Sequence, residues 1–196
     1  MNETVLTPER ILEAAEDVLR RFGPTKATVV DVARVLDVSH GSVYRHFPSK
    51  VALRDAVTKR WLARVSGPLE LIASEHTPAT ERLRRWLDGL IAAKRSRAFD
   101  DPELFATYME LVANAREVVT GHVDQLVGQV ARIVTDGTVS GEFTVADPMI
   151  ASRAVIDATA RFHNPVHAAE WSDPSIHGAF EAVWQLVLHG LGGGTH

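Results

Sequence analysis

The stretch DVSHGSVYRHFPSK, residues 37–50, interrupts an aliphatic run with a dense group of polar, aromatic and basic side chains. Two interpretations are open: a solvated surface turn, or a short helix that presses against a polyanion. On a helix that begins at Ser39, Val43 and Phe47 lie four residues apart and point inward together. The remaining side chains are then left on the outer surface, where they offer hydrogen-bond donors, a phenol and a glycine that permits close approach.

The residues before this stretch predict two more helices. A hydroxyl, a proline and an acid at residues 7–9 form a helix-start signal, and apolar residues recur at helical spacing over residues 11–22 until a Gly-Pro pair ends the pattern. Residues 28–36 are valine-rich, which suits a strand, but Thr28 is a natural N-cap and the apolar residues share one helical face, which favours a helix. Two short helices joined by a tight turn describe a helix-turn-helix, whose second helix enters the DNA major groove.

The charge of the chain is unevenly distributed. The formal net charge of the 196 residues is −4, yet residues 1–64 carry 11 Lys or Arg against 8 Asp or Glu, and the remaining residues carry 10 against 17. A basic first third on an acidic body is typical of a phosphate-binding module attached to a domain that does not bind DNA.

Composition excludes several classes of protein. Hydrophobic residues make up 45% of the chain and charged residues 23%, which is ordinary for a globular protein. No apolar run reaches the roughly 18 residues of a membrane span, and the N-terminus lacks the pattern of a secretory signal. The absence of cysteine excludes disulfides and thiol chemistry and fits a cytoplasmic location. No nucleophile elbow, phosphate loop or metal triad is present, so we expect no enzyme activity, no catalytic or metal site and no cofactor.

Residues 11–57 resemble the N-terminal region of the TetR, or tetracycline-repressor-like, family of bacterial regulators. The core of the resemblance is the pattern Val-Ser-x-Gly-Ser-Val-Tyr-x-His-Phe-x-x-Lys-x-x-Leu over residues 38–53. One departure is Asp37, which stands where the turn usually carries glycine and adopts a left-handed backbone less readily.

The resemblance implies an all-α protein of about nine helices. It places a helix-turn-helix DNA-binding domain of three helices at residues 1–50, a connecting helix at about 50–66, and a helical ligand-binding and dimerisation domain at 67–196.

The resemblance also implies a set of DNA-binding residues. Residues 39–47 would form the recognition helix, with Gly41 and Ser42 nearest the bases and Tyr44 and His46 on the sugar-phosphate edge. Thr28 and Lys50 match positions that contact phosphate in relatives, and the variable positions His40 and Arg45 are candidates for sequence selection. The full set is Thr28, Ser39, His40, Gly41, Ser42, Tyr44, Arg45, His46 and Lys50. Arg45, one of the variable positions, can pair with a guanine edge, with a phosphate or with a carboxylate of the protein itself.

The remaining two thirds of the chain predict five further helices, at about residues 78–98, 101–114, 116–136, 147–163 and 173–191. Asp-Pro pairs at 101, 147 and 173 each suit an N-cap followed by proline at the first helical position.

The last two of these helices carry the widest apolar faces. Their stripes consist of Ile150, Ala151, Ala154, Val155, Ala158 and Phe162 in one, and Phe180, Val183, Trp184, Val187, Leu188 and Leu191 in the other. In the family these two helices usually form the dimer. The alternative is that both stripes only complete the core of the monomer.

The resemblance also implies a sensor cavity between the DNA-binding module and the dimer helices. The candidate lining residues are Trp86, Phe99, Phe105, Tyr108, Met109, Val112, Phe162, His163 and His167. Each aromatic among them has the alternative of an ordinary core residue. His163 and His167 are four residues apart with Glu170 and His177 nearby, so they can bind a metal, line the ligand or pack in a polar turn, although Pro165 between them breaks regular helix geometry.

These observations together predict a cytoplasmic repressor that binds a palindromic double-stranded DNA operator as a homodimer. A small apolar or aromatic effector would release it, and no membrane partner is expected. The alternative is a regulator of the same fold with no small-molecule inducer, acting as an activator or through a protein partner.

Overall fold

The computed structural model describes residues 5–192, which form two compact units. Of the described residues, the first unit comprises 5–62 and 101–120, and the second comprises 63–100 and 121–192. Across residues 5–192 there are ten α-helices, one short 3-10 helix and no strand, which confirms the all-α fold. The outermost residues of the two predicted domains, 1–4 and 193–196, lie outside this description. None of the described helices is long and apolar enough to cross a membrane.

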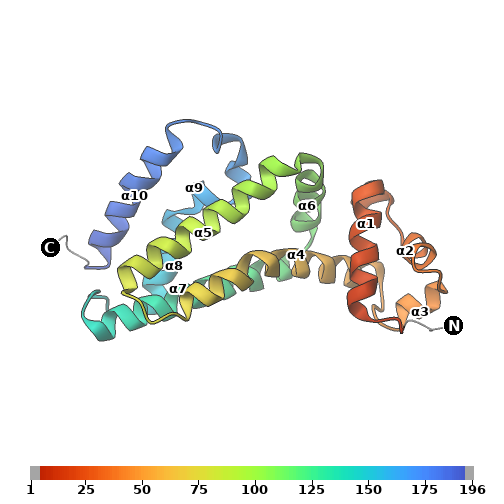
Figure 1. Ribbon diagram of the computed structural model, residues 1–196, viewed down its shortest axis with the longest axis horizontal. Coiled ribbons are helices and arrows are strands. Elements are labelled where there is room, and N and C mark those ends of the chain that lie inside the picture. The colour runs from red at the N-terminus through yellow and green to blue at the C-terminus, as the bar shows by residue number, and fades with distance from the viewer. Residues whose placement is uncertain (1–4, 193–196) are drawn as a thin grey trace. The chain divides into compact units, whose positions relative to one another are not determined.

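The first unit is a small helical bundle with its own core. It contains α1 (Pro8–Lys26), α2 (Val29–Val35), α3 (His40–Tyr44), the first half of α4 (Lys50–Ala73) and α6 (Pro102–Asn114) (Figure 1). Ile11, Val43 and Val57 are fully buried at its centre. The α6 helix packs against α1, and the Thr25 hydroxyl donates to Glu110 Oε1 at 2.8 Å. This contact joins a segment that is distant in sequence to the N-terminal helices.

The α1 helix begins as predicted, because the Thr7 hydroxyl accepts from the Arg10 N–H at 3.3 Å and Pro8 occupies the first turn. The predicted end at the Gly-Pro pair is instead a kink. Gly23 has φ 71° and ψ 164°, and the helix continues through Pro24 to Lys26. That backbone conformation is available to glycine and almost no other residue, which explains how the chain bends here.

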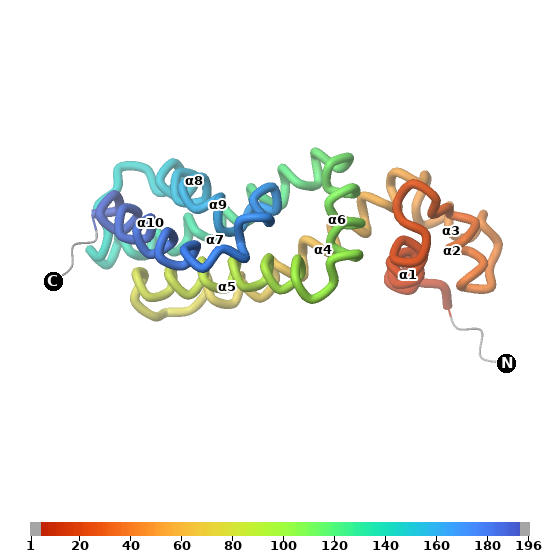
Figure 2. Tube along the Cα trace, turned by 90° about the horizontal axis from the view of Figure 1, so that it is seen from above, coloured from red at the N-terminus to blue at the C-terminus, as the bar shows by residue number. Residues whose placement is uncertain are grey.

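The helix-turn-helix is formed by α2 and α3, which pack against each other (Figure 2). Thr28 caps α2 in a capping box with Asp31, which confirms the helix over the strand for this valine-rich segment. Asp37 in the turn has φ 53°, so it adopts the left-handed conformation that glycine usually supplies. The α3 helix is shorter than the predicted 39–47: Ser39 is its N-cap, and its helical residues end at Tyr44.

The second unit is built around α5 (Ala79–Asp100) and the part of α7 (Arg116–Ser140) that follows Thr120, which run antiparallel (Figures 1 and 2). Trp86 Nε1 donates to Gln129 Oε1 at 3.0 Å, and Arg82 donates to Asp136 Oδ2 at 2.9 Å. The remaining elements of the unit are the second half of α4, α8 (Pro148–Ala158), α9 (Ala160–His163), the 3-10 helix η1 (Pro165–Glu170) and α10 (Ile176–Gly190).

Two glycine-containing segments that were predicted to end helices lie inside them. The α4 helix runs through Gly67 and Pro68 to Ala73, and α7 runs through Gly137 to Ser140. Gly137 is buried, and a Cβ on it would collide with Phe143 and Ala79. This glycine therefore permits close packing, and the turn comes at Gly141, where φ is 81°.

The predicted helix over 147–163 is divided in two. The Thr159 hydroxyl donates to the Val155 carbonyl at 2.8 Å, a back-bond that bends helices, and α8 and α9 meet at this residue.

Two of the three Asp-Pro predictions are confirmed. Asp101 caps α6 and Asp147 caps α8 through backbone N–H groups. The third was wrong: Asp173 accepts from the N–H and hydroxyl of Ser175 in a turn, and α10 begins only at Ile176.

Candidate functional site

The outer face of the helix-turn-helix carries most of the predicted DNA-binding residues. Val43 is fully buried and Phe47 is half-buried in the first unit, so they hold the segment down as expected. Tyr44 keeps 41% of its surface exposed. The other predicted residues at solvent-exposed positions are Thr28, Ser39, His40, Gly41, Arg45 and His46, while Ser42 is half-buried. One short helix therefore presents a continuous polar surface.

Local hydrogen bonds order that surface. The Ser39 hydroxyl accepts from the Ser42 N–H at 3.2 Å and lies 2.9 Å from its hydroxyl, and Arg45 Nη2 donates to the Ser42 hydroxyl at 2.9 Å. The rings of His40 and Tyr44 meet edge to face at 6.3 Å. Arg45 therefore lies along the helix with its other donors still available for a partner.

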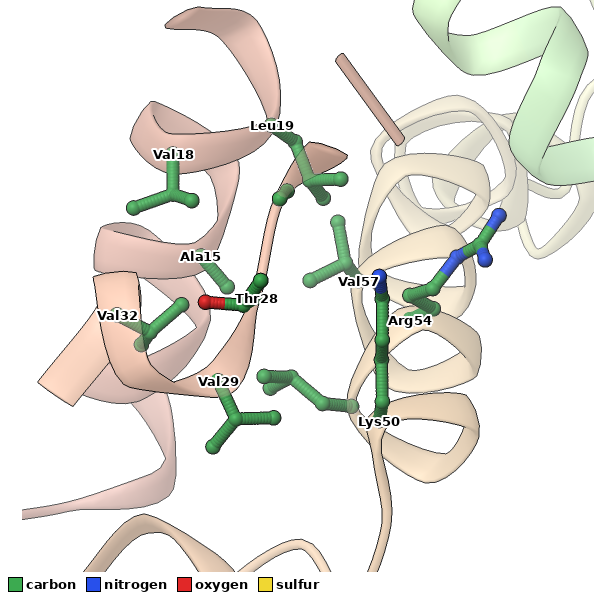
Figure 3. Close-up of a pocket in the computed structure, with 11 residues that line it drawn as sticks. Ala15, Val18, Leu19, Thr28, Val29, Val32, Lys50, Arg54 and Val57 are labelled. Atoms are coloured by element: carbon green, nitrogen blue, oxygen red, sulfur yellow. The ribbon is translucent and has the colours of Figure 1, made fainter. Parts of the chain in front are cut away.

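Thr28 and Lys50 lie on neighbouring elements of the same unit. Thr28 Oγ1 donates to Asp31 Oδ2 at 2.6 Å and accepts from the Asp31 N–H at 3.2 Å. The Thr28 hydroxyl, with help from Arg34, lowers the pKa of Asp31, so the cap stays ionised. Figure 3 shows Lys50 and Arg54 on α4 across from Thr28. Two cations thus accompany the N-cap of α2.

The hollow between these elements does not suit an organic ligand. It has a volume of about 20 Å³, and its walls are mainly aliphatic side chains of α1 and α2 (Figure 3). Ligand pockets are typically in the range of about 300–1,000 Å³. Because the hollow is so small, the useful feature of this region is its basic rim.

Two family models of one class of regulator match most of the chain. The family described as "Bacterial regulatory proteins, tetR family" matches residues 11–57, and "Tetracyclin repressor-like, C-terminal domain" matches residues 79–184. The chain belongs to the TetR family. It is therefore a DNA-binding transcription regulator, of a family whose members are generally not enzymes. No curated protein sequence matches the chain significantly.

Solved structures of TetR-family proteins share the fold. SmeT, the repressor of the Stenotrophomonas maltophilia multidrug efflux pump SmeDEF, is 20% identical with a TM-score of 0.67, over 94% of this chain and 90% of that chain. The SmeT–triclosan complex is 18% identical with a TM-score of 0.66, over 93% and 90%. FadR from Bacillus subtilis in complex with stearoyl-CoA is 18% identical with a TM-score of 0.59, over 97% and 100%.

The predicted sensor residues are divided between the cores of the two units. Phe105, Met109 and Val112 pack against the core of the first unit together with buried Tyr108, whose ring is 5.9 Å from that of Trp61. Trp86 and Phe162 lie in the core of the second unit. Phe99, at 48% exposure, is on the surface. Trp86, Tyr108 and Phe162 therefore lie in the cores of their units, whereas Phe99 does not.

The two histidines of the sensor set have different environments. His163 is buried, and its Nε2 lies 3.2 Å from the Thr159 hydroxyl. His167 is half-buried in η1 and its Nδ1 lies 2.8 Å from Glu170 Oε1. No group of three or more His, Cys, Asp or Glu suited to a metal ion occurs in residues 5–192. His167 thus belongs to a polar turn, whereas His163 faces the core.

Two buried basic residues were missed in the sequence. Lys94 on α5 and His122 on α7 are each only 7% exposed. Their positions contain a signal, because Lys94 continues the spacing of Leu83, Leu87 and Leu90 along the apolar stripe of α5. A titratable residue at a stripe position is expected to be buried, and this marks it as a functional candidate.

Proposed function

We propose that this TetR-family regulator is a ligand-released repressor that binds a palindromic operator as a homodimer. The observation that carries the proposal is the exposed polar face of α3, with Val43 and Phe47 directed into the core of the unit. A helix of this kind at the second position of a helix-turn-helix fits the DNA major groove.

The proposed roles of the side chains follow from their chemistry. Gly41 and Ser42 allow close approach to the bases, and Arg45 and His40 select sequence, Arg45 through bidentate bonds to a guanine edge. Tyr44, His46, Thr28 and Lys50 contact the sugar-phosphate backbone and set the register of the helix, as does Ser39. The Arg45–Ser42 bond supports this assignment, because it positions the guanidinium beside the proposed base-contacting residues.

A homodimer is supported by exposed apolar stripes on α8 and α10, which pack against each other. Ile150 is 69% exposed and Leu186 is 72% exposed, and exposed small residues continue both stripes: Ala154 and Ala158 on α8, Gly178 and Ala182 on α10. Small residues permit close helix approach, and a two-fold copy of the same face would cover both stripes. Most of the bulky residues predicted for the dimer, including Phe180 and Trp184, lie instead in the monomer core. On α10 the proposed interface is therefore the opposite side of the helix, whereas on α8 it keeps the exposed members of the predicted stripe, Ile150, Ala154 and Ala158.

An effector would act by preferring the dimer geometry that does not fit DNA. A preference of about 1–3 kcal/mol is sufficient for 5- to 150-fold release. The α4 helix is the proposed lever, because its residues up to Leu62 belong to the first unit and those from Ala63 to the second. A cavity of about 70 Å³ in the second unit has Phe162 and Phe180 among its lining residues; it is smaller than a typical ligand pocket, so an effector there would have to displace side chains.

The experiment is a binding selection of genomic fragments with the purified protein, followed by titration of the retained operator at several salt concentrations. Log affinity falls as log salt rises, and Lys50→Ala is expected to make this negative slope less steep by about one. Arg45→Ala is expected to relax preference at one base pair, with Arg132→Ala, an exposed cation of the second unit, as the control. Unchanged affinity, salt slope and base preference in both Lys50→Ala and Arg45→Ala would refute the proposed docking.

A further inference from the structure

Three basic side chains are buried inside the second unit. Lys94 of α5, His122 of α7 and His163 of α9 are each 7% exposed. Ionisable residues of these types are rarely buried in a core unless a partner compensates them. Of the three, His122 needs a physical explanation, because its ring nitrogens make no hydrogen bond within residues 5–192.

The packing of the helices brings them together. The hydrogen bonds Arg82–Asp136 and Trp86–Gln129 fix the antiparallel register of α5 and α7, and the same register continues to place Lys94 opposite His122. The α9 helix, which carries His163, packs against α5. The charge of Lys94 acts on the pKa of both histidines, as expected for neighbours.

His122 lacks a partner for its polar atoms. Both of its ring nitrogens are buried, and neither has a hydrogen bond within residues 5–192. Leaving such a group unsatisfied costs about 1–3 kcal/mol, and it is rare in native proteins. His163 differs, because its Nε2 lies beside Thr159, whose hydroxyl donates onward to the Val155 carbonyl.

The electrostatic environment of this cluster is positive. Burial lowers the pKa of Lys94 to about 8, with Arg97 acting in the same direction. Burial also lowers the pKa of His122 to about 3, assisted by Lys94 and Arg97, and that of His163 to about 4. At neutral pH the cluster therefore consists of one ammonium and two neutral imidazoles, with the guanidinium of Arg97 nearby. A metal cation would be repelled here, whereas an anion would be attracted.

Several residues adjacent to the cluster are buried and apolar. Leu90, one turn before Lys94, is fully buried, and Leu126, one turn after His122, is 4% exposed. Phe162, next to His163, is 3% exposed. A ligand whose charged group reached Lys94 and His122 would thus have hydrocarbon around the rest of it.

We propose that Lys94 and His122 bind the carboxylate of an organic acid with an apolar body. The ammonium and the imidazole N–H donate to the two carboxylate oxygens, and His163 lines the same site. The inference rests on the proposed function in one respect, which is that this acid would be the effector that releases DNA. Charge-assisted hydrogen bonds are about twice as strong as neutral ones, so the acid is distinguished from a neutral compound of the same shape.

The test is calorimetric titration of the full chain with three acid and amide pairs: phenylacetate and phenylacetamide, indole-3-acetate and indole-3-acetamide, and octanoate and octanamide. At least one acid is expected to bind tenfold or more tightly than its amide. Lys94→Met and His122→Phe are each expected to weaken that acid about tenfold or more and to leave its amide within threefold. Lys59→Met and His76→Phe, at exposed positions, are the matched controls, and melting curves verify folding of every variant.

Each outcome is decisive. Acids that bind no better than amides, acids that keep their affinity in both cluster variants, or a lack of binding by all three acids would overturn the inference. A gel shift with the selected operator separates it from the proposed function. An acid that binds through Lys94 without releasing DNA supports the site and contradicts ligand release. If neutral compounds release DNA equally well from the wild type and from Lys94→Met, that result supports ligand release and overturns the acid site.

Discussion

Replacing His122 by Phe should make the stability of the protein less sensitive to acid. Burial holds the folded-state pKa of His122 near 3, against 6.5 for an ordinary histidine. The unfolded chain therefore binds a proton that the folded chain does not, over the range between these values. Stability is fully present above pH 6.5 and is lost progressively as the pH falls toward 3.

The size of the effect follows from the width of that interval. At pH 5 an unfolded histidine is almost fully protonated while buried His122 stays neutral, which lowers the free energy of unfolding by about 2 kcal/mol relative to pH 7. Phenylalanine keeps a planar aromatic ring, although a larger one, and cannot bind a proton. The difference in unfolding free energy between pH 7 and pH 5 should thus be about 2 kcal/mol smaller in His122→Phe than in the wild type.

Urea denaturation followed by circular dichroism at pH 7 and pH 5 measures this difference. The control is His76→Phe, at an exposed position in the same unit, which should retain the wild-type pH dependence. If His122→Phe lost as much stability as the wild type between the two pH values, His122 would be solvated or protonated in the folded protein. The reasoning on the buried cluster would then be wrong.

Three further predictions concern packing, backbone and assembly. Gly137→Ala should lower the free energy of unfolding by about 1–3 kcal/mol in urea titrations, because its methyl group overlaps Phe143. Gly23→Ala should lower the free energy of unfolding by about 1–3 kcal/mol through backbone strain alone, since its Cβ would meet no atom within 4 Å. Its control is Gly67→Ala in the interior of α4, which should leave the free energy of unfolding unchanged or raise it by up to about 1 kcal/mol. Leu186→Glu should convert a dimer to a monomer in sedimentation experiments, and an unchanged mass would contradict the proposed α8–α10 face.

The helix-turn-helix could be predicted from sequence because local chemistry specifies it. The Thr28 and Ser39 caps act over three residues, and Val43 and Phe47 reveal the inward face of α3 by their spacing alone. Even the atypical Asp37 adopts the left-handed turn, because the flanking helices impose it on a residue that tolerates it. Interactions over so few residues can be predicted from a single sequence.

Helix ends in the second unit were harder to predict because they depend on particular side-chain contacts. In the sequence Gly137 resembles a helix-breaking residue. In the structure it is the residue that allows α7 to continue, because a side chain there would overlap Phe143. Asp173 has the same Asp-Pro signal as Asp147, but Ser175 captures its carboxylate in a turn before a helix can begin. Both competitions are decided by side-chain contacts that spacing does not encode.

The buried basic cluster shows most clearly where sequence reasoning ends. Lys94 stands at an apolar stripe position, so its burial could be predicted, yet burial alone fits a snorkelling lysine whose head reaches water as well as a binding site. The register of α5 on α7 decides between them, since the Trp86–Gln129 bond places His122 opposite Lys94, inside the unit. A neutral imidazole with no hydrogen bond beside a buried ammonium destabilises the protein without a ligand. A bound carboxylate would supply the hydrogen-bond partner that the His122 ring lacks, so the cost in stability and the proposed acid specificity have the same origin.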